Sequence, residues 1–110
     1  MLTKNIFADA QPPEQGERFE ELLRHCNLVI ERIVSSAQIT PTEYVQAQDE
    51  WVVLMQGEAV LRMQGTVLHL KSGDYVFIAA GVKHIVESAS HGAIWLAVHL
   101  YPKPLAENLP

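Results

Sequence analysis

The segment EYVQAQDEWVVLMQGEAVL, from Glu43 to Leu61, determines the fold that this sequence predicts. Its centre, EWVVLMQ, is a short run of β-branched, aromatic and aliphatic residues that stops at the turn dipeptide Gln56-Gly57. A second run, EAVLRMQ, begins directly after this dipeptide and ends at another Gln-Gly pair. Short apolar runs that follow each other across Gly-containing turns, with no room for a helix, predict antiparallel β-strands.

The same pattern extends over most of the chain. From residue 27 to residue 101, apolar runs of similar length alternate with turn residues such as Gly, Pro, Asp and Ser. The candidate strands are NLVIERIVSS, TEYVQAQ, EWVVLMQ, EAVLRMQ, TVLHLKS, YVFIAA, HIVESA and AIWLAVHL. So many short strands without intervening helices predict an all-β domain over residues 27–101, built as an antiparallel sandwich or a small barrel.

The two ends of the chain have different patterns. In PPEQGERFEELLRHC, the residues Phe19, Leu22, Leu23 and Cys26 are three or four positions apart and would share one face of a helix. We therefore expect residues 1–26 to form an N-terminal arm with a short helix from about Glu17 to Cys26, lying outside the barrel, with Cys26 in the core. The Pro-containing tail, residues 102–110, predicts an extended wrap or a frayed end.

Composition limits the class of protein. A chain of 110 residues with 48% hydrophobic and 19% charged residues suits one globular domain. Its net charge of -5 provides no basic surface, which argues against nucleic acid or an anionic membrane as partner. The single cysteine cannot form an internal disulfide, no secretory signal is visible, and no apolar run approaches the ~20 residues of a membrane span. We expect a soluble cytoplasmic protein.

Two predicted strands are apolar on both faces. WVVLM and AIWLAV lack the alternation that a barrel strand with one solvated face would show. The outer face could be covered by the N-terminal helix or the tail, or by a second copy of the chain. One short helix cannot cover the outer faces of two strands, so we favour a homodimer whose interface includes Trp51 or Trp95.

A second motif carries a resemblance to a known family. In GDYVFIAAGVKH, the residues Gly73, Gly81 and His84 have the spacing of the second motif of cupins, with Ala79 where that motif has proline. The chain thus resembles a single-domain cupin of the cupin 2 conserved barrel type over about residues 30 to 100. This resemblance implies an antiparallel jelly-roll β-barrel with a central cavity.

The first cupin motif, His-x-His followed by Glu and Gly, is altered in this chain. Glu50 and Gly57 match it, but both histidines are absent. If three residues separate the second histidine position from Glu50, the two histidine positions fall on Tyr44 and Gln46. If four residues separate them, the positions fall on the residues just before these two. We adopt Tyr44 and Gln46, because residues two apart on a strand share a face and both carry oxygen. The chain also resembles a subgroup of uncharacterised bacterial cupins with Tyr and Gln at these positions.

The resemblance implies candidate site residues. Glu50 and His84 are the main candidates for metal ligands and for an acid and base pair, and Tyr44, Gln46 and His99 are weaker candidates for ligands. Tyr44, Gln46, Glu50 and His84 should converge on one cavity. A phenol and an amide bind metal less well than imidazole, so a divalent ion (Zn, Ni, Mn or Fe) would be held weakly and with little selectivity. The other histidines, His25, His69 and His91, are expected at the surface.

Three functions follow from these residues. The first is binding of a small molecule in the barrel cavity, with or without a weakly held divalent metal. The second is a cupin enzyme, which would be metal-dependent or a metal-free isomerase or lyase that uses Glu50 and His84. The third is a non-catalytic dimerisation module. The missing histidines disfavour an iron oxygenase, and no nucleophile or phosphate-loop motif is present, so the sequence leaves open whether the protein is an enzyme.

Overall fold

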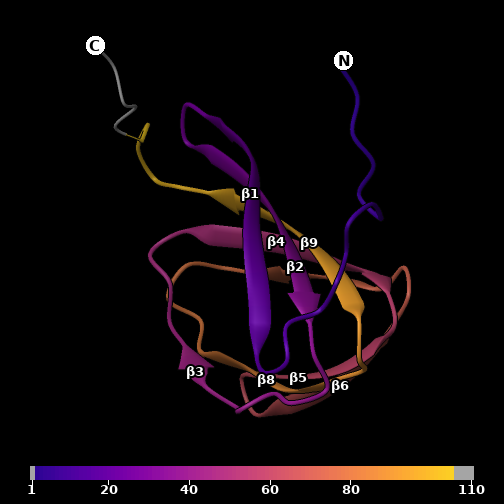
Figure 1. Cartoon of the computed structure of the whole chain (residues 1–110). Helices are drawn as coiled ribbons and strands as arrows, with labels where there is room; N and C mark the ends of the chain where they lie inside the picture. Colours follow the sequence, from indigo (N-terminus) through magenta and orange to yellow (C-terminus); the bar gives the residue numbers. More distant parts are fainter. Residues whose placement is uncertain (1, 106–110) are drawn as a thin grey trace.

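A computed structural model describes residues 2–105 of the chain, and its regular elements are nine β-strands (Figure 1). The strands are β1 (Glu17–His25), β2 (Leu28–Ser35), β3 (Glu43–Tyr44), β4 (Asp49–Gln56), β5 (Glu58–Met63), β6 (Thr66–Lys71), β7 (Tyr75–Ile78), β8 (His84–Ala89) and β9 (Ala93–Leu100). These described residues contain no helix, and therefore none long and apolar enough to cross a membrane.

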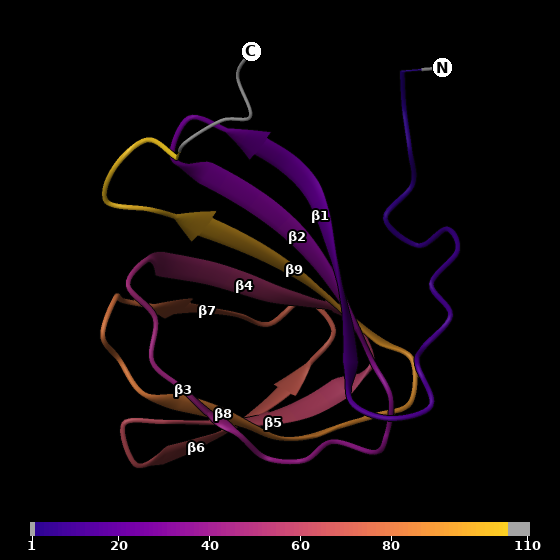
Figure 2. The same ribbon diagram turned by 60° about the vertical axis from the view of Figure 1, so that its left-hand side comes forward.

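The strands form two antiparallel sheets that face each other. One sheet has the order β1-β2-β9-β4-β7 and the other has the order β3-β8-β5-β6. Figure 2 shows the two sheets as separate layers, with chain crossovers that connect them. Strands distant in sequence, such as β2 and β9, pair along their whole length. The predicted antiparallel jelly-roll barrel is therefore confirmed.

Alternation along the strands places the core between the sheets. On β4, Val52 and Leu54 are buried, whereas Trp51, which precedes Val52 and points to the opposite face, is exposed. On the neighbouring strand β9, Trp95 and Ala97 are buried opposite Leu54 and Val52. Because side chains two apart on a strand share a face, the residues that continue these two inward rows, one of them Glu50, also face the interior.

The predicted N-terminal helix is wrong, because residues 17–25 form strand β1. This strand pairs with β2 from Glu17 opposite Ser35 to His25 opposite Leu28, with a bulge between Glu21 and Leu23. The bulge produces the irregular spacing of apolar residues that resembled a helical period. Long-range pairing along the whole of β2 outweighs the local pattern.

The turn between β1 and β2 explains a second correction. Cys26, which was expected in the core, is exposed in this turn and has a left-handed backbone with φ of 54°. The chain after β9 returns to the same turn, because Tyr101 donates a backbone hydrogen bond of 2.8 Å to Asn27 and Leu105 donates one of 2.8 Å to Cys26. The tail is thus a wrap as far as Leu105, and residues 106–110 of the predicted tail lie outside the described residues.

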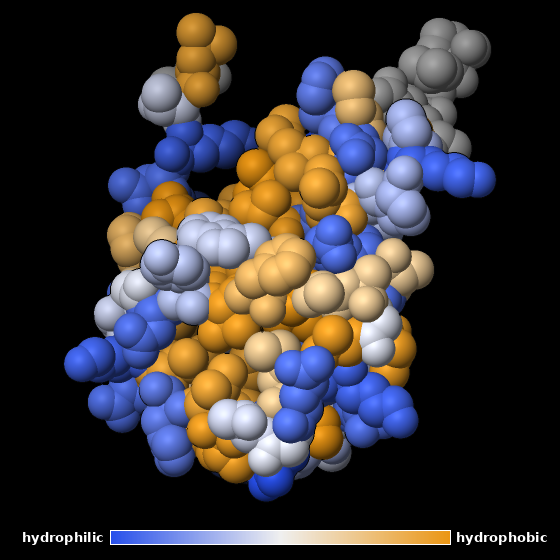
Figure 3. Space-filling view, turned by 180° about the vertical axis from the view of Figure 1, so that it is seen from behind, coloured by the Kyte–Doolittle hydropathy of each residue, from blue (hydrophilic) through white to orange (hydrophobic). Residues whose placement is uncertain are grey.

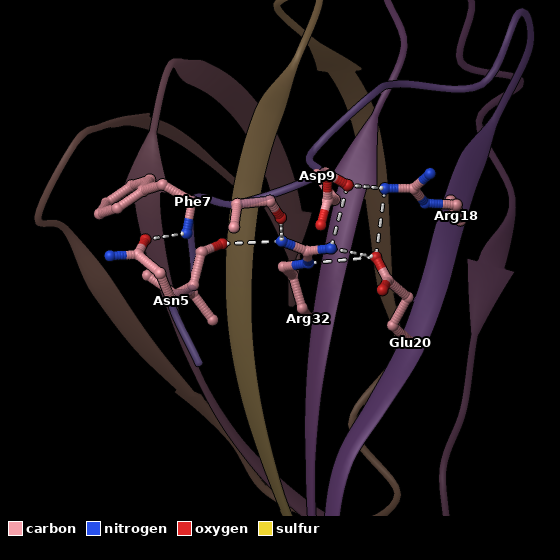
Figure 4. Close-up of polar contacts among 8 residues, drawn as sticks. Asn5, Phe7, Asp9, Arg18, Glu20 and Arg32 are labelled. Atoms are coloured by element: carbon pink, nitrogen blue, oxygen red, sulfur yellow. Dashed lines mark hydrogen bonds and ion pairs between the residues drawn. The ribbon is translucent and has the colours of Figure 1, made fainter. Parts of the chain in front are cut away.

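One buried guanidinium attaches the N-terminal arm to the five-stranded sheet (Figure 4). Arg32 on β2 is 5% exposed and donates hydrogen bonds to the backbone carbonyls of Ile6, Ala8 and Asp9. It also contacts the Glu20 carboxylate on β1, with an Nη2 to Oε1 distance of 2.7 Å. The arm therefore lies across β1 and β2 without secondary structure of its own.

The outer face of the same sheet exposes aromatic side chains. Trp51, Tyr75 and Phe77 on β4 and β7 are exposed, and the Trp51 and Tyr75 rings lie 5.4 Å apart. Seen from behind, hydrophobic residues form a broad area over the middle of the molecule (Figure 3). Trp95 is only 3% exposed and faces the core, so of the two tryptophans considered for a dimer interface only Trp51 is available.

Candidate functional site

A cavity of about 80 Å³ lies between the two sheets. Aliphatic and aromatic side chains, among them Val52, Leu61, Ile78 and Trp95, form part of its wall. All five residues that the sequence singled out line this one cavity, together with two further glutamates. The polar lining residues are Glu17, Glu31, Tyr44, Gln46, Glu50, His84 and His99.

Glu50 and His99 line the cavity as cross-strand partners. They are paired on β4 and β9 and are 6% and 7% exposed. Burial raises the pKa of the Glu50 carboxyl above its ordinary value, and the nearby His99 and His84 lower it by less. The Glu50 carboxyl therefore holds its proton to higher pH than an exposed glutamate would.

His99 uses both of its ring nitrogens within the protein. Its Nε2 lies 3.2 Å from Oε1 of Glu31, and its Nδ1 lies 3.3 Å from the side-chain amide nitrogen of Gln48. The hydrogen bond to Glu31 is the main reason that the pKa of His99 is raised, against an opposing effect of burial. In the neutral His99 ring, Nδ1 accepts a hydrogen bond from the side-chain amide nitrogen of Gln48. In the charged ring, Nδ1 would donate to the amide oxygen of Gln48, so neither form leaves a ring nitrogen free. His99 is a fixed partner of Glu31.

His84 presents one ring nitrogen to the cavity. Its Nδ1 lies 3.1 Å from the backbone carbonyl of Val82 and therefore carries the proton in the neutral ring. Its Nε2 is then an acceptor, and it lies 4.0 Å from Oε1 of Glu50, which is too far for a hydrogen bond. Pairing of β3 with β8 sets Tyr44 opposite His84, and the two rings stack with centroids 5.8 Å apart. The cavity thus has an unused imidazole nitrogen facing a carboxyl group.

Gln46 adds a second unused acceptor. Its side-chain oxygen Oε1 is buried and has no hydrogen-bond partner. A buried polar atom without a partner costs on the order of 1–3 kcal/mol, so the fold keeps this oxygen at a cost. Such an atom in a cavity is a position where a ligand or a water molecule donates a hydrogen bond.

Sequence reasoning missed Glu17 and Glu31. Glu17 lay in the segment that was predicted to be a helix, and in the structure its Oε2 accepts a hydrogen bond of 2.6 Å from Ser35. Burial raises the pKa of Glu17, the Ser35 hydrogen bond lowers it, and the charge of Glu50 raises it further. Glu31 could have been found, because it shares a strand face with the buried Val29 and the cavity-lining Ile33.

The donor set does not fit a tightly bound metal ion. Among residues 2–105, no three His, Cys, Asp or Glu side chains are grouped so that they could hold one. His99 has no free nitrogen, and a phenol such as that of Tyr44 binds divalent metal less well than an imidazole does. The divalent metal suggested by the resemblance therefore stays a prediction.

Comparison with known proteins identifies the fold family. The family model for the cupin domain matches residues 30–99, which is more than half of the chain. The chain belongs to the cupin family. No protein of curated function matches it.

Solved structures of other cupin-like chains superpose closely on this one. A Ralstonia eutropha protein named "putative mannose-6-phosphate isomerase" is 33% identical, with a TM-score of 0.84 over 90% of this cupin and 97% of that chain. A Thermus thermophilus protein is 20% identical, with a TM-score of 0.78 over 92% and 98% of the two chains. A conserved Streptococcus pyogenes protein of unknown function is 15% identical, with a TM-score of 0.77 over 92% and 88%. The last two likenesses show the fold alone.

Proposed function

We propose that this cupin binds a small polar molecule in the cavity between its sheets. The observation that carries the proposal is a pair of acceptors without a hydrogen-bonding protein donor, namely the buried Oε1 of Gln46 and Nε2 of His84, which lies 4.0 Å from the Glu50 carboxyl. Ligand sites in proteins combine an apolar wall with a few convergent polar groups, and this cavity has that composition. Small-molecule binding explains why the fold keeps these polar groups inside the barrel.

Proton transfer is the second candidate function. The gap of 4.0 Å between Glu50 Oε1 and His84 Nε2 leaves the two groups unbonded to each other, so each can exchange a proton with a ligand held beside them. The raised pKa of Glu50 suits a carboxyl that must hold a proton and then release it to a ligand. This arrangement supports isomerase or lyase chemistry without a metal, and the 33% identical neighbour named as an isomerase is consistent with it.

The substrate in that neighbour's name does not suit this cavity. Mannose 6-phosphate carries a phosphate dianion, and proteins recognise phosphate through Arg, Lys or clustered backbone N–H groups. Among the described residues that line the cavity, three are glutamates and none is Lys or Arg. A phosphorylated sugar would therefore be repelled by like charge, and we propose an unphosphorylated ligand for this chain.

The test uses the buried tryptophan as a reporter. Trp95 lines the cavity and Trp51 lies on the outer surface, so their two indole N–H resonances give a site signal and an internal control. We expect small hydroxylated or amine compounds to shift the Trp95 signal in a saturable way and to leave Trp51 unchanged. Val86→Phe, which fills the cavity, should abolish the effect, whereas Val67→Phe at an exposed position should not.

Two results would contradict the proposal. One is a panel of uncharged, cationic and anionic fragments of which none shifts Trp95 more than Trp51 at millimolar concentration. The other is equal binding to the wild type and to Val86→Phe. A metal arm with Zn²⁺ or Mn²⁺ on the same protein, and on His84→Ala, tests the weakly held ion separately.

A further inference from the structure

We infer that the ligand of this cavity is a small organic cation that carries N–H donors, of the primary amine class. The inference rests on the proposed function, because it names the chemistry of the molecule bound at the same site. Three independent properties of the cavity support it: the balance of charge, the kind of hydrogen-bonding atom left unused, and the nature of the wall.

The charge balance of the cavity is acidic. Glu17, Glu31 and Glu50 all line it, and no lysine or arginine does among the described residues. Glu31 has an imidazole partner, since Nε2 of His99 lies 3.2 Å from its Oε1. Glu17 is hydrogen-bonded by the neutral Ser35 hydroxyl, and Glu50 has the same His99 as its cross-strand partner and Nε2 of His84 at 4.0 Å. Three carboxyl groups thus share two imidazoles, and a cationic ligand would complete the balance of charge.

Two polar atoms of the cavity that no protein donor satisfies are acceptors. Nε2 of His84 accepts because the proton of the neutral ring is on Nδ1, and the residue is 6% exposed. Oε1 of Gln46 accepts because it is an amide oxygen, and it is buried without a partner. The indole N–H of Trp95, a donor of the same wall, is already used in a 3.0 Å hydrogen bond to Ser35. A ligand that donates would satisfy both of these atoms, and an ammonium group offers three donors and no acceptor.

The wall suits an organic cation with a short stem. Aromatic rings from Phe19, Tyr44 and Trp95 line the cavity, and aromatic faces attract ammonium groups by roughly 0.5–2 kcal/mol. Val52 and Leu61 provide apolar surface for carbon atoms. A volume of about 80 Å³ holds on the order of five water-sized groups, which limits the ligand to a short chain.

A bare metal cation would match the charge but not the geometry. Residues 2–105 contain no group of three suitable ligands, and both nitrogens of His99 are occupied. An ammonium group needs no fixed coordination number and donates to carboxylate, amide and imidazole acceptors at ordinary hydrogen-bond distances. The organic cation therefore fits the described residues better.

The experiment titrates the ¹⁵N-labelled full chain with three molecules of nearly equal shape: propylammonium, 1-propanol and propionate, at constant ionic strength. We expect propylammonium to shift the Trp95 indole resonance with an affinity at least about tenfold above that of 1-propanol, and propionate to give no saturable shift. Glu50→Gln keeps the shape of the side chain and removes its charge, and it should weaken propylammonium binding about tenfold or more. Glu58→Gln, an exposed glutamate outside the cavity, should leave binding unchanged.

The outcomes separate this inference from the proposed function. Equal affinities for propylammonium and 1-propanol would overturn the amine class while leaving a ligand-binding cavity intact. Saturable binding of Zn²⁺ or Mn²⁺ that excludes propylammonium would also overturn it. No binding by any of the three organic probes contradicts both. If Glu50→Gln loses the native spectrum, Glu17→Gln on the edge strand β1 replaces it, and unchanged propylammonium affinity in that folded variant overturns the charge argument.

Discussion

The backbone N–H of Gly81 donates a hydrogen bond of 2.8 Å to the carbonyl of Gln46. Next to it, the N–H of Ala80 donates to the Asp49 carboxylate at 2.8 Å. These two bonds join the turn that precedes His84 to the loop that precedes Glu50. The two sequence motifs, more than thirty positions apart, are therefore one structural unit, and this unit keeps the cavity geometry although the first motif has lost its histidines.

Gly57, at the end of the first motif, should be the least replaceable of the turn glycines. Its φ is +93°, and a Cβ added there would lie 2.6 Å from Oγ of Ser90 and 3.0 Å from Cβ of Ala93. We expect Gly57→Ala to lower the free energy of unfolding by about 2–4 kcal/mol, from left-handed strain and from overpacking. Gly65→Ala, where φ is +75° but the space is open, should cost only about 1–2 kcal/mol. Equal costs in urea unfolding would show that the contact with Ser90 is relieved without penalty.

The Arg32 guanidinium should hold the N-terminal arm on the sheet. Arg32→Met removes the donors to Ile6, Ala8 and Asp9 and should destabilise the protein by about 2–4 kcal/mol, because buried charge-assisted hydrogen bonds are lost. Proteolysis within residues 2–15 should accelerate at the same time. Arg62→Met breaks an exposed ion pair with Glu87 and should cost no more than about 1 kcal/mol. An Arg32 variant that is as resistant to proteolysis as the Arg62 variant would contradict this role.

Stability should be higher at mildly acidic than at mildly alkaline pH. The pKa values of Glu17 and Glu50 are raised above 4.5 in the folded state, so their contribution is present at low pH and is lost as pH rises through the folded values. The pKa of His99 is raised above 6.5, so its contribution is complete below 6.5 and is also lost on alkalinisation. All three groups act in the same direction.

Urea midpoints measured from pH 5.5 to pH 8.5 test this dependence. Glu50→Gln removes one of the three titrating groups and should flatten the decline, whereas Glu58→Gln should leave its slope unchanged. A wild-type midpoint that rises with pH over this range would contradict the assignment of burial as the dominant influence on Glu17 and Glu50.

The sequence was sufficient for the barrel, because strand alternation is a local pattern, and for the convergence of its motifs, because their spacing resembles that of the two cupin motifs. Alternation on EWVVLMQ fixes the inward face of β4, and motif spacing fixes His84 at the start of β8. The sequence was not sufficient for β1. A bulge there spaces the apolar residues as in a helix, and the contacts that make the segment a strand are with β2. Glu17 was missed for the same reason, since its place in the cavity depends on that pairing.

The state of His99 could not be inferred from its strand alone. His99 points inward because it shares a strand face with Trp95 and Ala97. Its partners Glu31 and Gln48, however, come from other segments of the chain. A lone histidine on an apolar strand is equally compatible with a ligand and with a hydrogen-bonded core group. Only the contacts distinguish the two, and here they occupy both nitrogens.

The outer face of the five-stranded sheet gives the expected homodimer a specific surface. Phe77 is paired with Trp51 across β4 and β7, Tyr75 lies beside them, and all three side chains are exposed. Single exposed apolar residues are ordinary, but an aromatic cluster on a sheet favours a contact, and a twofold axis lets the same cluster cover itself.

We expect light scattering at micromolar concentration to give about twice the 12.3 kDa of one chain. Phe77→Lys should shift the protein to the monomer without unfolding it, whereas Leu2→Lys, at a fully exposed arm position, should not. A wild-type mass of 12.3 kDa would contradict the dimer, and a Phe77→Lys protein that stays dimeric would place the interface elsewhere.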